Sequence, residues 1–267
     1  MEWKNRPGEL FVENYRFEAD SGKASIGSNY RESDMSGFRV IESTLPGHEC
    51  STIVTGHIWR SDGSARSSCV RLLSELLRRH IERSGFCPET GCILFAGIGN
   101  AGLASDSLGP KCASRILPTT LDENLISAGA VRIAVIAPGI PAKTGIDTAK
   151  QVRVIADHMN AGLIITADSV AAGSGKWLQS VIQITDRGVT PGSATASSMS
   201  GAINAEGMGR PVISIGVPMV IRADMICGDT LEDSSEPLLV TRAEADAISD
   251  CYSGIIAGAV NLTVLGK

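Results

Sequence analysis

The sequence has few aromatic residues and no block of basic residues, and both deficits limit what the protein can do. Aromatic side chains make up 4% of its 267 residues, and the 29 acidic residues outnumber the 24 basic ones, which leaves a net charge of −5. Proteins that bind nucleic acid usually carry a basic patch or stripe, so no direct nucleic-acid partner is expected. An acidic balance of this size mostly favours solubility.

Cysteine pairs and long apolar runs are also missing. None of the seven cysteines forms a Cys-x-x-Cys pair, their number is odd, and several lie inside apolar runs, which is typical of a reducing compartment. The first residues, MEWKNRPGEL, lack the apolar core of a secretory signal, and no apolar run approaches the length of a membrane span. We therefore expect a cytoplasmic protein without a membrane partner.

Motifs for metal binding, serine catalysis and triphosphate binding are absent as well. The four histidines share no metal-ligand spacing with one another or with a cysteine. No G-x-S-x-G motif surrounds Ser193 or Ser197, and no Gly-Lys-Ser/Thr follows the glycine-rich stretch near residue 97. These patterns predict neither a metal nor a resident cofactor.

What the sequence does contain is an alternation of apolar runs and helical patterns. Near-continuous apolar strands, each followed by a helix, are typical of a parallel sheet that is covered on both faces. The expected fold class is therefore α/β, a three-layer sandwich with a mostly parallel central sheet. Residues 1–37 are polar and rich in glycine, serine and charge, so we expect a flexible N-terminal extension or pro-segment before a single catalytic domain over residues 38–267.

The individual elements follow from periodicity and from glycine and proline positions. The clearest is an amphipathic helix over residues 64–85, whose apolar stripe ends at Gly85. Pro218 should end or kink its strand, and Thr241 and Glu244 have the spacing of a capping box. Strands are expected over residues 38–45, 50–59, 92–98, 131–138, 163–170, 180–186 and 211–221, and further helices over 107–117, 148–162 and 241–264.

The stretch ILFAGIGNAGLASDSLGP, residues 93–110, permits two interpretations. Its G-x-G-x-x-G pattern, which starts at Gly97, has the spacing of a dinucleotide loop between a strand and a helix. However, the next apolar run ends in Pro-Gly without the acid that would hold a ribose. The alternative is that the loop presents Asp106 for chemistry.

Asp106 and Asp168 each follow or end an apolar strand, and the carboxyl ends of parallel strands meet at one edge of a sheet. If the two strands are neighbours, the carboxyls lie close together, and removal from water raises their pKa values. Taken singly, each residue is equally well explained as a helix cap or a loop anchor. As a pair, they could act as general acid and general base. Asp186 also follows a strand, but a turn explains it.

An ordered series of segments across residues 93–221 resembles the germination protease family of spore-forming bacteria. The segments are GIGN, SDSLGP, APGI, KTGIDT, ITADSVAAGS, IQITDRGVTPGS and GRPVISIGVPMVI. The resemblance implies an atypical aspartic endopeptidase that starts the degradation of small acid-soluble spore proteins in the spore core during germination. It also implies synthesis as a zymogen, assembly as a homo-oligomer (a tetramer), and a fold similar to hydrogenase-maturation proteases and phosphorylase-like proteins.

The same resemblance implies roles for individual residues. The two catalytic aspartates of the family fall on Asp106 and Asp168. Substrate-binding positions are expected in the matching segments, at Gly97, Gly99, Asn100, Gly139, Thr144, Gly145, Asp186, Gly188, Gly192 and Ser193. No cofactor is implied. The family's N-terminal processing motif is not found in residues 1–37.

Three other functions remain open at this point. The first is a metal-sensing maturation protease on the same fold, which nickel binding would favour. The second is a dinucleotide-binding enzyme that uses the G-x-G-x-x-G loop, which a thermal shift with NAD or NADP would favour. The third is a non-catalytic spore protein with the same fold, which would cleave no spore protein under any condition.

Overall fold

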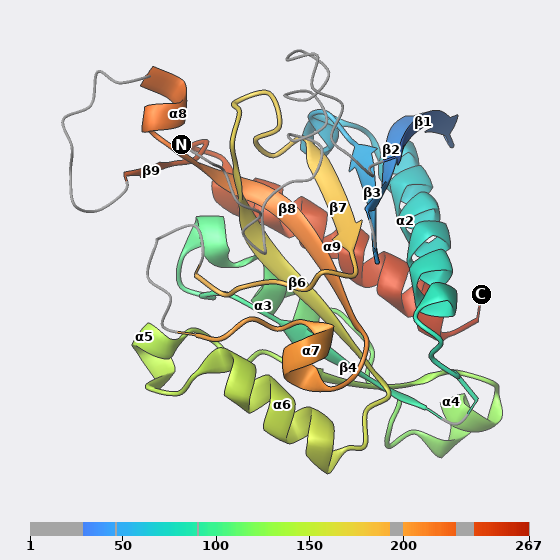
Figure 1. Ribbon diagram of the computed structural model, residues 1–267. Coiled ribbons are helices and arrows are strands. Elements are labelled where there is room, and N and C mark those ends of the chain that lie inside the picture. The colour runs from blue at the N-terminus through green and yellow to red at the C-terminus, as the bar shows by residue number, and fades with distance from the viewer. Residues whose placement is uncertain (1–28, 46, 90, 193–199, 228–237, 267) are drawn as a thin grey trace.

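The computed structural model describes residues 29–45, 47–89, 91–192, 200–227 and 238–266 (Figure 1). A nine-stranded sheet runs through the molecule, in the order β1-β2-β3-β7-β8-β6-β4-β5, with β9 paired to β8. The strands are β1 (Asn29–Met35), β2 (Phe38–Leu45), β3 (His48–Val54), β4 (Cys92–Gly97), β5 (Arg132–Ile136), β6 (Leu163–Ala172), β7 (Val181–Thr185), β8 (Val212–Arg222) and β9 (Leu239–Val240).

The sheet has a parallel half and an antiparallel half. β5, β4, β6 and β8 are joined in parallel. β1, β2, β3 and β7 continue the sheet from β8 by antiparallel pairs, and β9 is antiparallel to β8. The expected α/β class is confirmed, with a mixed sheet. Short turns link β1, β2 and β3, which makes those pairs antiparallel, and β7 is antiparallel to both β3 and β8.

Helices cover both faces of the sheet and make three layers (Figure 1). Successive residues of β4 point to opposite faces: Ile93 and Phe95 pack in one core cluster, and Leu94 and Ala96 pack in another. The first cluster includes residues of α2 (Gly63–Arg83), α3 (Leu108–Ala113) and α9 (Ala245–Val264). The second includes residues of α6 (Thr148–His158) and α7 (Ala205–Met208).

The remaining short helices lie in the connections between these elements. They are η1 (Ile58–Arg60), η2 (Ala104–Asp106), α4 (Glu123–Ser127), α5 (Pro141–Thr144) and α8 (Asp224–Cys227). Three of them, η2, α5 and α8, follow strands of the parallel half. They therefore belong to the loops at the carboxyl edge of the sheet, where open α/β sheets bind their ligands.

α2 confirms the amphipathic helix predicted over residues 64–85. Its N-terminus is capped by Asp62, whose Oδ1 accepts a hydrogen bond from the Ala65 N–H at 3.0 Å. The chain turns away at Gly85, which has a φ of +74°. The apolar stripe that the pattern predicted is buried in the first core cluster: Leu72, Leu73, Leu76, Leu77 and Ile81.

Among the described residues, α9 is the helix that is long and apolar enough to cross a membrane by length and composition alone, contrary to the expectation that no run approaches that length. Its apolar side chains are nevertheless used inside the protein. Ile248, Tyr252 and Ile256 are fully buried, and α9 contacts both α2 and α3. The Tyr252 hydroxyl donates a hydrogen bond to the Gln179 carbonyl at 2.9 Å. A core helix explains this composition.

The N-terminal boundary requires a correction. Residues 29–35 form β1, which pairs with β2 around a turn at Ser36 and Gly37, where φ is +54° and +82°. The flexible extension expected over residues 1–37 is therefore too long, and residues 1–28 lie outside the described residues. The pairing depends on backbone hydrogen bonds, which a polar strand can make as well as an apolar one.

Two expectations near the C-terminus concern β8 and α9. β8 does not end at Pro218 but continues as far as Arg222. Its pairing with β6 is irregular directly after the proline, because Val170 pairs with Pro218 and Ala171 pairs with Val220, which leaves Met219 as an extra residue in β8. Thr241 does not cap α9, because its hydroxyl donates to the Met219 carbonyl at 2.7 Å.

The close approach of α3 to β4 generates a stability prediction. A Cβ on Gly109 would lie 2.1 Å from the Ile98 carbonyl oxygen and 2.5 Å from that of Ala167. We expect Gly109→Ala to lower the free energy of unfolding by about 2–3 kcal/mol, because backbone must move. The control is Gly254→Ala on the exposed face of α9, where nothing lies within 4 Å and a gain of about 0.5–1 kcal/mol is expected. Urea unfolding of both variants measures the difference, and equal effects would contradict the packing.

Candidate active site

Asp168 lies at the point where β6 continues beyond its neighbour β4. β4 ends at Gly97, which pairs with Ala167, so Asp168 follows the last residue in register with β4. On its other side β6 remains paired with β8, and Asp168 lies opposite Gly216. A longer β4 would fill the space beside Asp168; because β4 ends at Gly97, the loop after β4 occupies this space instead. This is the carboxyl edge of the parallel strands, where the sequence predicted a site.

The loop after β4 folds back so that one of its N–H groups binds Asp106. The Asn100 N–H donates to Asp106 Oδ2 at 2.8 Å and to the Asp106 backbone carbonyl at 2.9 Å. Gly99 has a φ of +127°, and a Cβ there would lie 2.2 Å from the Asp106 backbone oxygen. A dinucleotide loop would offer its N–H groups to a phosphate, but this N–H is taken by a carboxylate. The geometry favours the interpretation that the loop presents an acid.

Two glycines bring the start of α3 against the end of β4. A Cβ on Gly97 would lie 2.1 Å from the Gly109 carbonyl oxygen, and a Cβ on Gly109 would meet the Ile98 and Ala167 backbone. η2, which ends at Asp106, contacts both β6 and β8 as a result. The two glycines thus allow these backbone segments to pack closely, and this packing places Asp106 near Asp168.

Burial and proximity raise the pKa values of both carboxyls. Asp168 is 6% exposed, and its burial holds its pKa well above the usual range; the negative charge of Asp106 raises that pKa further. The Ser169 N–H, which donates to Asp168 Oδ1 at 2.7 Å, opposes the rise. Burial raises the pKa of Asp106 to about 6, and the hydrogen bond from the Asn100 N–H lowers it in part.

The two carboxyls therefore differ in how readily they ionise. Burial and the neighbouring charge of Asp106 both disfavour the ionised form of Asp168, so Asp106 ionises first. Asp106, with a pKa of about 6, is mostly ionised. A carboxylate beside a carboxylic acid can accept one proton and donate another, which is the equipment of general acid–base chemistry. The structure thus brings together the two acids that the sequence singled out.

The α5 segment lies beside the glycine loop and contributes a residue that the sequence analysis missed. Gly139 and Gly145 have φ values of +74° and +69° and bound this segment, and the Thr144 methyl lies 3.1 Å from the Cβ position of Gly139. The Lys143 Nζ lies 2.9 Å from the position that a Cβ on Gly102 would take. Three of the expected substrate-binding residues thus flank a lysine at the loop. The position of Lys143 between the Pro-Gly and Thr-Gly-Ile segments is the feature of the sequence that could have identified it.

Asp186 does not join the pair. β7 runs antiparallel to β8, so the residue after β7 lies towards the amino ends of the parallel strands, away from Asp168. The Asp186 carboxylate accepts a hydrogen bond from the Glu49 N–H at 3.1 Å and lies 3.2 Å from His48 Nδ1. These contacts tie β7 to β3, in agreement with the turn that explained this residue from the sequence.

The rest of the turn after β7 has mainly structural contacts where it is described. A Cβ on Gly188 would lie 2.0 Å from the Ile203 carbonyl oxygen, which shows tight packing of this turn against the chain that returns to β8. Gly192 has a φ of +79°. Ser193 lies outside the described residues, so its expected contact with substrate stays a prediction.

Metal ligands and reactive thiols are not assembled at this edge. In the ranges that the structure describes, no three histidine, cysteine, aspartate or glutamate side chains are grouped to hold a metal ion. The Cys69 and Cys112 thiols are buried, and burial raises the pKa of Cys69 to about 12. Burial likewise raises the pKa of Cys112. Neither thiol is suited to nucleophilic attack, since the thiolate is the reactive form.

Comparison with known proteins gives a consistent result. The Germination protease family model matches residues 38–234. A germination protease of Bacillus cereus (strain G9842) is 31% identical over 191 residues, which are 70% of this chain and 51% of that protein. One of Oceanobacillus iheyensis is 28% identical over 185 residues, which are 68% of this chain and 50% of that protein. The chain therefore spans about half the length of the curated relatives it matches.

The solved structures include one weak similarity. A nickel–iron hydrogenase maturation protease, HycI from Thermococcus kodakarensis, superposes with a TM-score of 0.34 and 17% identity, over 63% of this chain and 92% of that one. At that score the superposition supports no conclusion. The family model covers most of the chain and includes both Asp106 and Asp168. The chain belongs to the germination protease family.

Proposed function

We propose that this protein is an endopeptidase that hydrolyses peptide bonds with Asp106 and Asp168 and starts the degradation of small acid-soluble spore proteins during germination. One observation carries the proposal: a buried carboxyl, Asp168, and a half-buried one, Asp106, interact with each other, both have raised pKa values, and the charge of Asp106 raises the pKa of Asp168 further. They lie within the residues that match the family.

The proposed reaction divides the work between the two carboxyls. Asp106, ionised, takes a proton from a water molecule as the water oxygen attacks the carbonyl carbon of the scissile bond. Asp168, protonated, donates a hydrogen bond and then its proton to the carbonyl oxygen. When the tetrahedral intermediate collapses, the C–N bond breaks, the leaving nitrogen receives the proton held by Asp106, and Asp168 recovers its own.

Features of the carboxyl edge support the approach of a polypeptide. Gly102 is exposed on the loop and has no side chain, so substrate backbone can come close there, and the exposed Lys143 ammonium beside it can donate hydrogen bonds to substrate carbonyls. The adjacent part of β6 and β8 extends beyond β4 and offers a wall along which a chain can lie. We expect the substrate to cross this edge between the loop and α5.

The family resemblance supports the broader parts of the proposal. These are small acid-soluble spore proteins as substrates, action in the spore core, and assembly as a homo-tetramer. They also include synthesis as a zymogen, in which residues within the first 28 would restrain activity. Each belongs to whole proteins of which the matched residues make up about half, so each needs its own test.

Substitution of either acid should abolish cleavage. We expect Asp106→Asn and Asp168→Asn to lower the rate at least about a hundredfold, because each removes one proton-transfer group. Asp34→Asn is the matched control, since it neutralises an exposed aspartate on β1, remote from β4 and β6 in the sheet, and should stay close to the parent rate. Mass spectrometry of a small spore protein, incubated with intact protein and with protein trimmed at its N-terminus, measures the products. Cleavage retained by either active-site variant would refute the mechanism; no cleavage by any form would favour a non-catalytic spore protein.

The rate should also depend on pH in a bell-shaped manner. Activity should rise as the pH passes about 6, where Asp106 loses its proton. It should fall again at higher pH, where Asp168 ionises, because the raised pKa of Asp168 places its proton loss above that of an ordinary aspartate. Measurement of kcat/KM across the pH range tests this. A rate that stays constant between roughly pH 5 and pH 9 would contradict the assignment.

Burial of Asp168 should cost stability as pH rises. The ordinary pKa of aspartate, 3.8, applies in the unfolded chain, so the unfolded state releases the proton first and the parent protein loses stability from about pH 4 up to the raised pKa. Asp168→Asn has no such proton to lose, so its stability should not fall over this range of pH, and it should be the more stable protein at neutral pH.

The control for this measurement is Asp250→Asn on α9. A hydrogen bond from Arg115 lowers the pKa of Asp250, so its ionised form stabilises the fold above the ordinary pKa. Asp250→Asn should therefore lower stability at neutral pH, the opposite sign. Chemical denaturation at a series of pH values checks both, and a loss of stability in Asp168→Asn at neutral pH would contradict the burial cost.

A further inference from the structure

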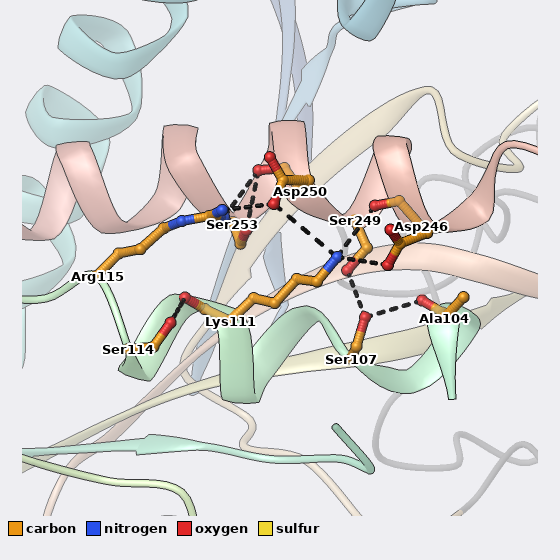
Figure 2. A network of polar contacts seen from close by, with 9 residues as sticks. All are labelled: Ala104, Ser107, Lys111, Ser114, Arg115, Asp246, Ser249, Asp250 and Ser253. Carbon is orange, nitrogen blue, oxygen red and sulfur yellow. Dashed lines mark hydrogen bonds and ion pairs between the residues drawn. The ribbon is translucent and has the colours of Figure 1, made fainter. Parts of the chain in front are cut away.

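A chain of buried hydroxyl groups connects α9 to the segment that carries Asp106 (Figure 2). Ser107 directly follows Asp106, and its Oγ donates to the Ala104 carbonyl, at the start of η2, at 3.0 Å. The Ser107 and Ser249 hydroxyl oxygens lie 2.9 Å apart. Both side chains are buried, with Ser107 1% and Ser249 0% exposed, so water does not compete for these bonds.

The direction of these bonds follows from the number of protons. A serine hydroxyl has one proton to donate and can accept two hydrogen bonds. Ser107 gives its proton to the Ala104 carbonyl, so Ser249 must be the donor in the pair. The order is therefore Ser249 to Ser107 to Ala104, from the middle of the first core layer to the first residue of η2. η2 then ends at Asp106, the ionised acid of the site.

A second, independent set of contacts holds the rest of α3 on α9. Lys111 Nζ donates to Asp246 Oδ1 at 2.8 Å, and Arg115 binds the Asp250 carbonyl at 2.9 Å as well as its carboxylate (Figure 2). Arg115 also donates to the hydroxyl of Ser253, one turn after Ser249. α3 would therefore stay docked on α9 even without the Ser249 hydroxyl. The effect expected from that hydroxyl is on the position of η2.

We propose that Ser249 is a positioning residue of the two-aspartate site and holds the Asp106 carboxyl in place beside Asp168 through Ser107. α9 begins at Ala245, after the last residue of the family match, so the contact comes from an element outside residues 38–234. The interaction of two charges varies inversely with their separation, so a small displacement of Asp106 changes how the pair shares its proton. Displacement of a reacting group also lowers the rate of the chemical step.

Ser253 provides a matched control on the same helix. It is four residues after Ser249, equally buried at 0% exposure, and hydrogen-bonded to the end of α3 rather than to η2. Ser249→Ala and Ser253→Ala each remove one buried hydroxyl from the same helix. Both should lower Tm by a similar amount, about 2–4 °C. A purely structural role would make the two variants alike in every other measurement.

The first measurement does not depend on catalysis. Carboxyl carbon NMR of the full chain, labelled at aspartate, follows the titration of Asp106 and Asp168. We expect Ser249→Ala to move the titration midpoints of the pair by about half a pH unit, and Ser253→Ala to leave them in place. If Ser249 acts through Ser107, then the double variant Ser107→Ala/Ser249→Ala should titrate like Ser107→Ala alone, because neighbours in one network are not additive.

The second measurement rests on the proposed function. With a small spore protein as substrate, Ser249→Ala should lower kcat about tenfold with little change in KM and should shift the pH–rate profile in the same direction as the NMR titration. Ser253→Ala should keep the parent profile. If the parent protein cleaves nothing, the proposed function fails, while the titration still decides the positioning role.

Two results would overturn the inference. One is an Asp106/Asp168 titration in Ser249→Ala that is the same as in the parent protein. The other is an equal displacement of the midpoints in Ser253→Ala, which would show that any loss of a buried hydroxyl from α9 disturbs the site. If Ser249→Ala does not fold, Ser107→Ala replaces it in the comparison with Ser253→Ala, and unchanged midpoints in Ser107→Ala would overturn the inference in the same way.

Discussion

The proposed chemistry depends on two neighbouring carboxyl groups, one buried and one half-buried, beyond the end of β4. Asp168 is buried because β6 and β8 continue past β4 while the returning loop covers the vacated side. A buried carboxyl lowers the cost of an unpaired charge by keeping its proton, so burial favours the protonated form of Asp168. The less buried Asp106 ionises first. In the proposed mechanism, this difference in burial distinguishes the general acid from the general base.

Close backbone contact is the means by which the fold achieves this. Gly97, Gly99 and Gly109 allow the strand end, the loop and α3 to approach within distances that any Cβ would prevent. The same glycine spacing could have served a pyrophosphate, but here the loop is closed on its own aspartate. α9, the most apolar helix described, contributes a hydroxyl on one turn and ion-pair acceptors on others to fix α3 and η2. The core and the site therefore share one supporting helix.

Local patterns predicted most of the parallel half to within a few residues, because strand and helix periods are written in consecutive residues. They failed where a long-range contact decided the outcome. β1 has the polar sequence NYRESDM and gains its structure from pairing with β2. Pro218 stays within β8 because the pairing with β6 resumes after one extra residue, Met219, in β8 itself. Lys143 lies in a short helix with no periodicity of its own, and only its contact with the glycine loop gives it significance.

The sequence by itself determined which side chains could do chemistry: two aspartates at the ends of apolar strands, and no metal-ligand or serine-nucleophile pattern to compete with them. The tertiary structure decided that β4 and β6 are neighbours and that their register leaves Asp168 just beyond Gly97. It also decided that Asp186, directly after antiparallel β7, lies towards the amino ends of the parallel strands. The physical reason is that periodicity records which face of an element is buried. Strand pairing, register and the removal of water from a carboxyl arise only when the whole core packs.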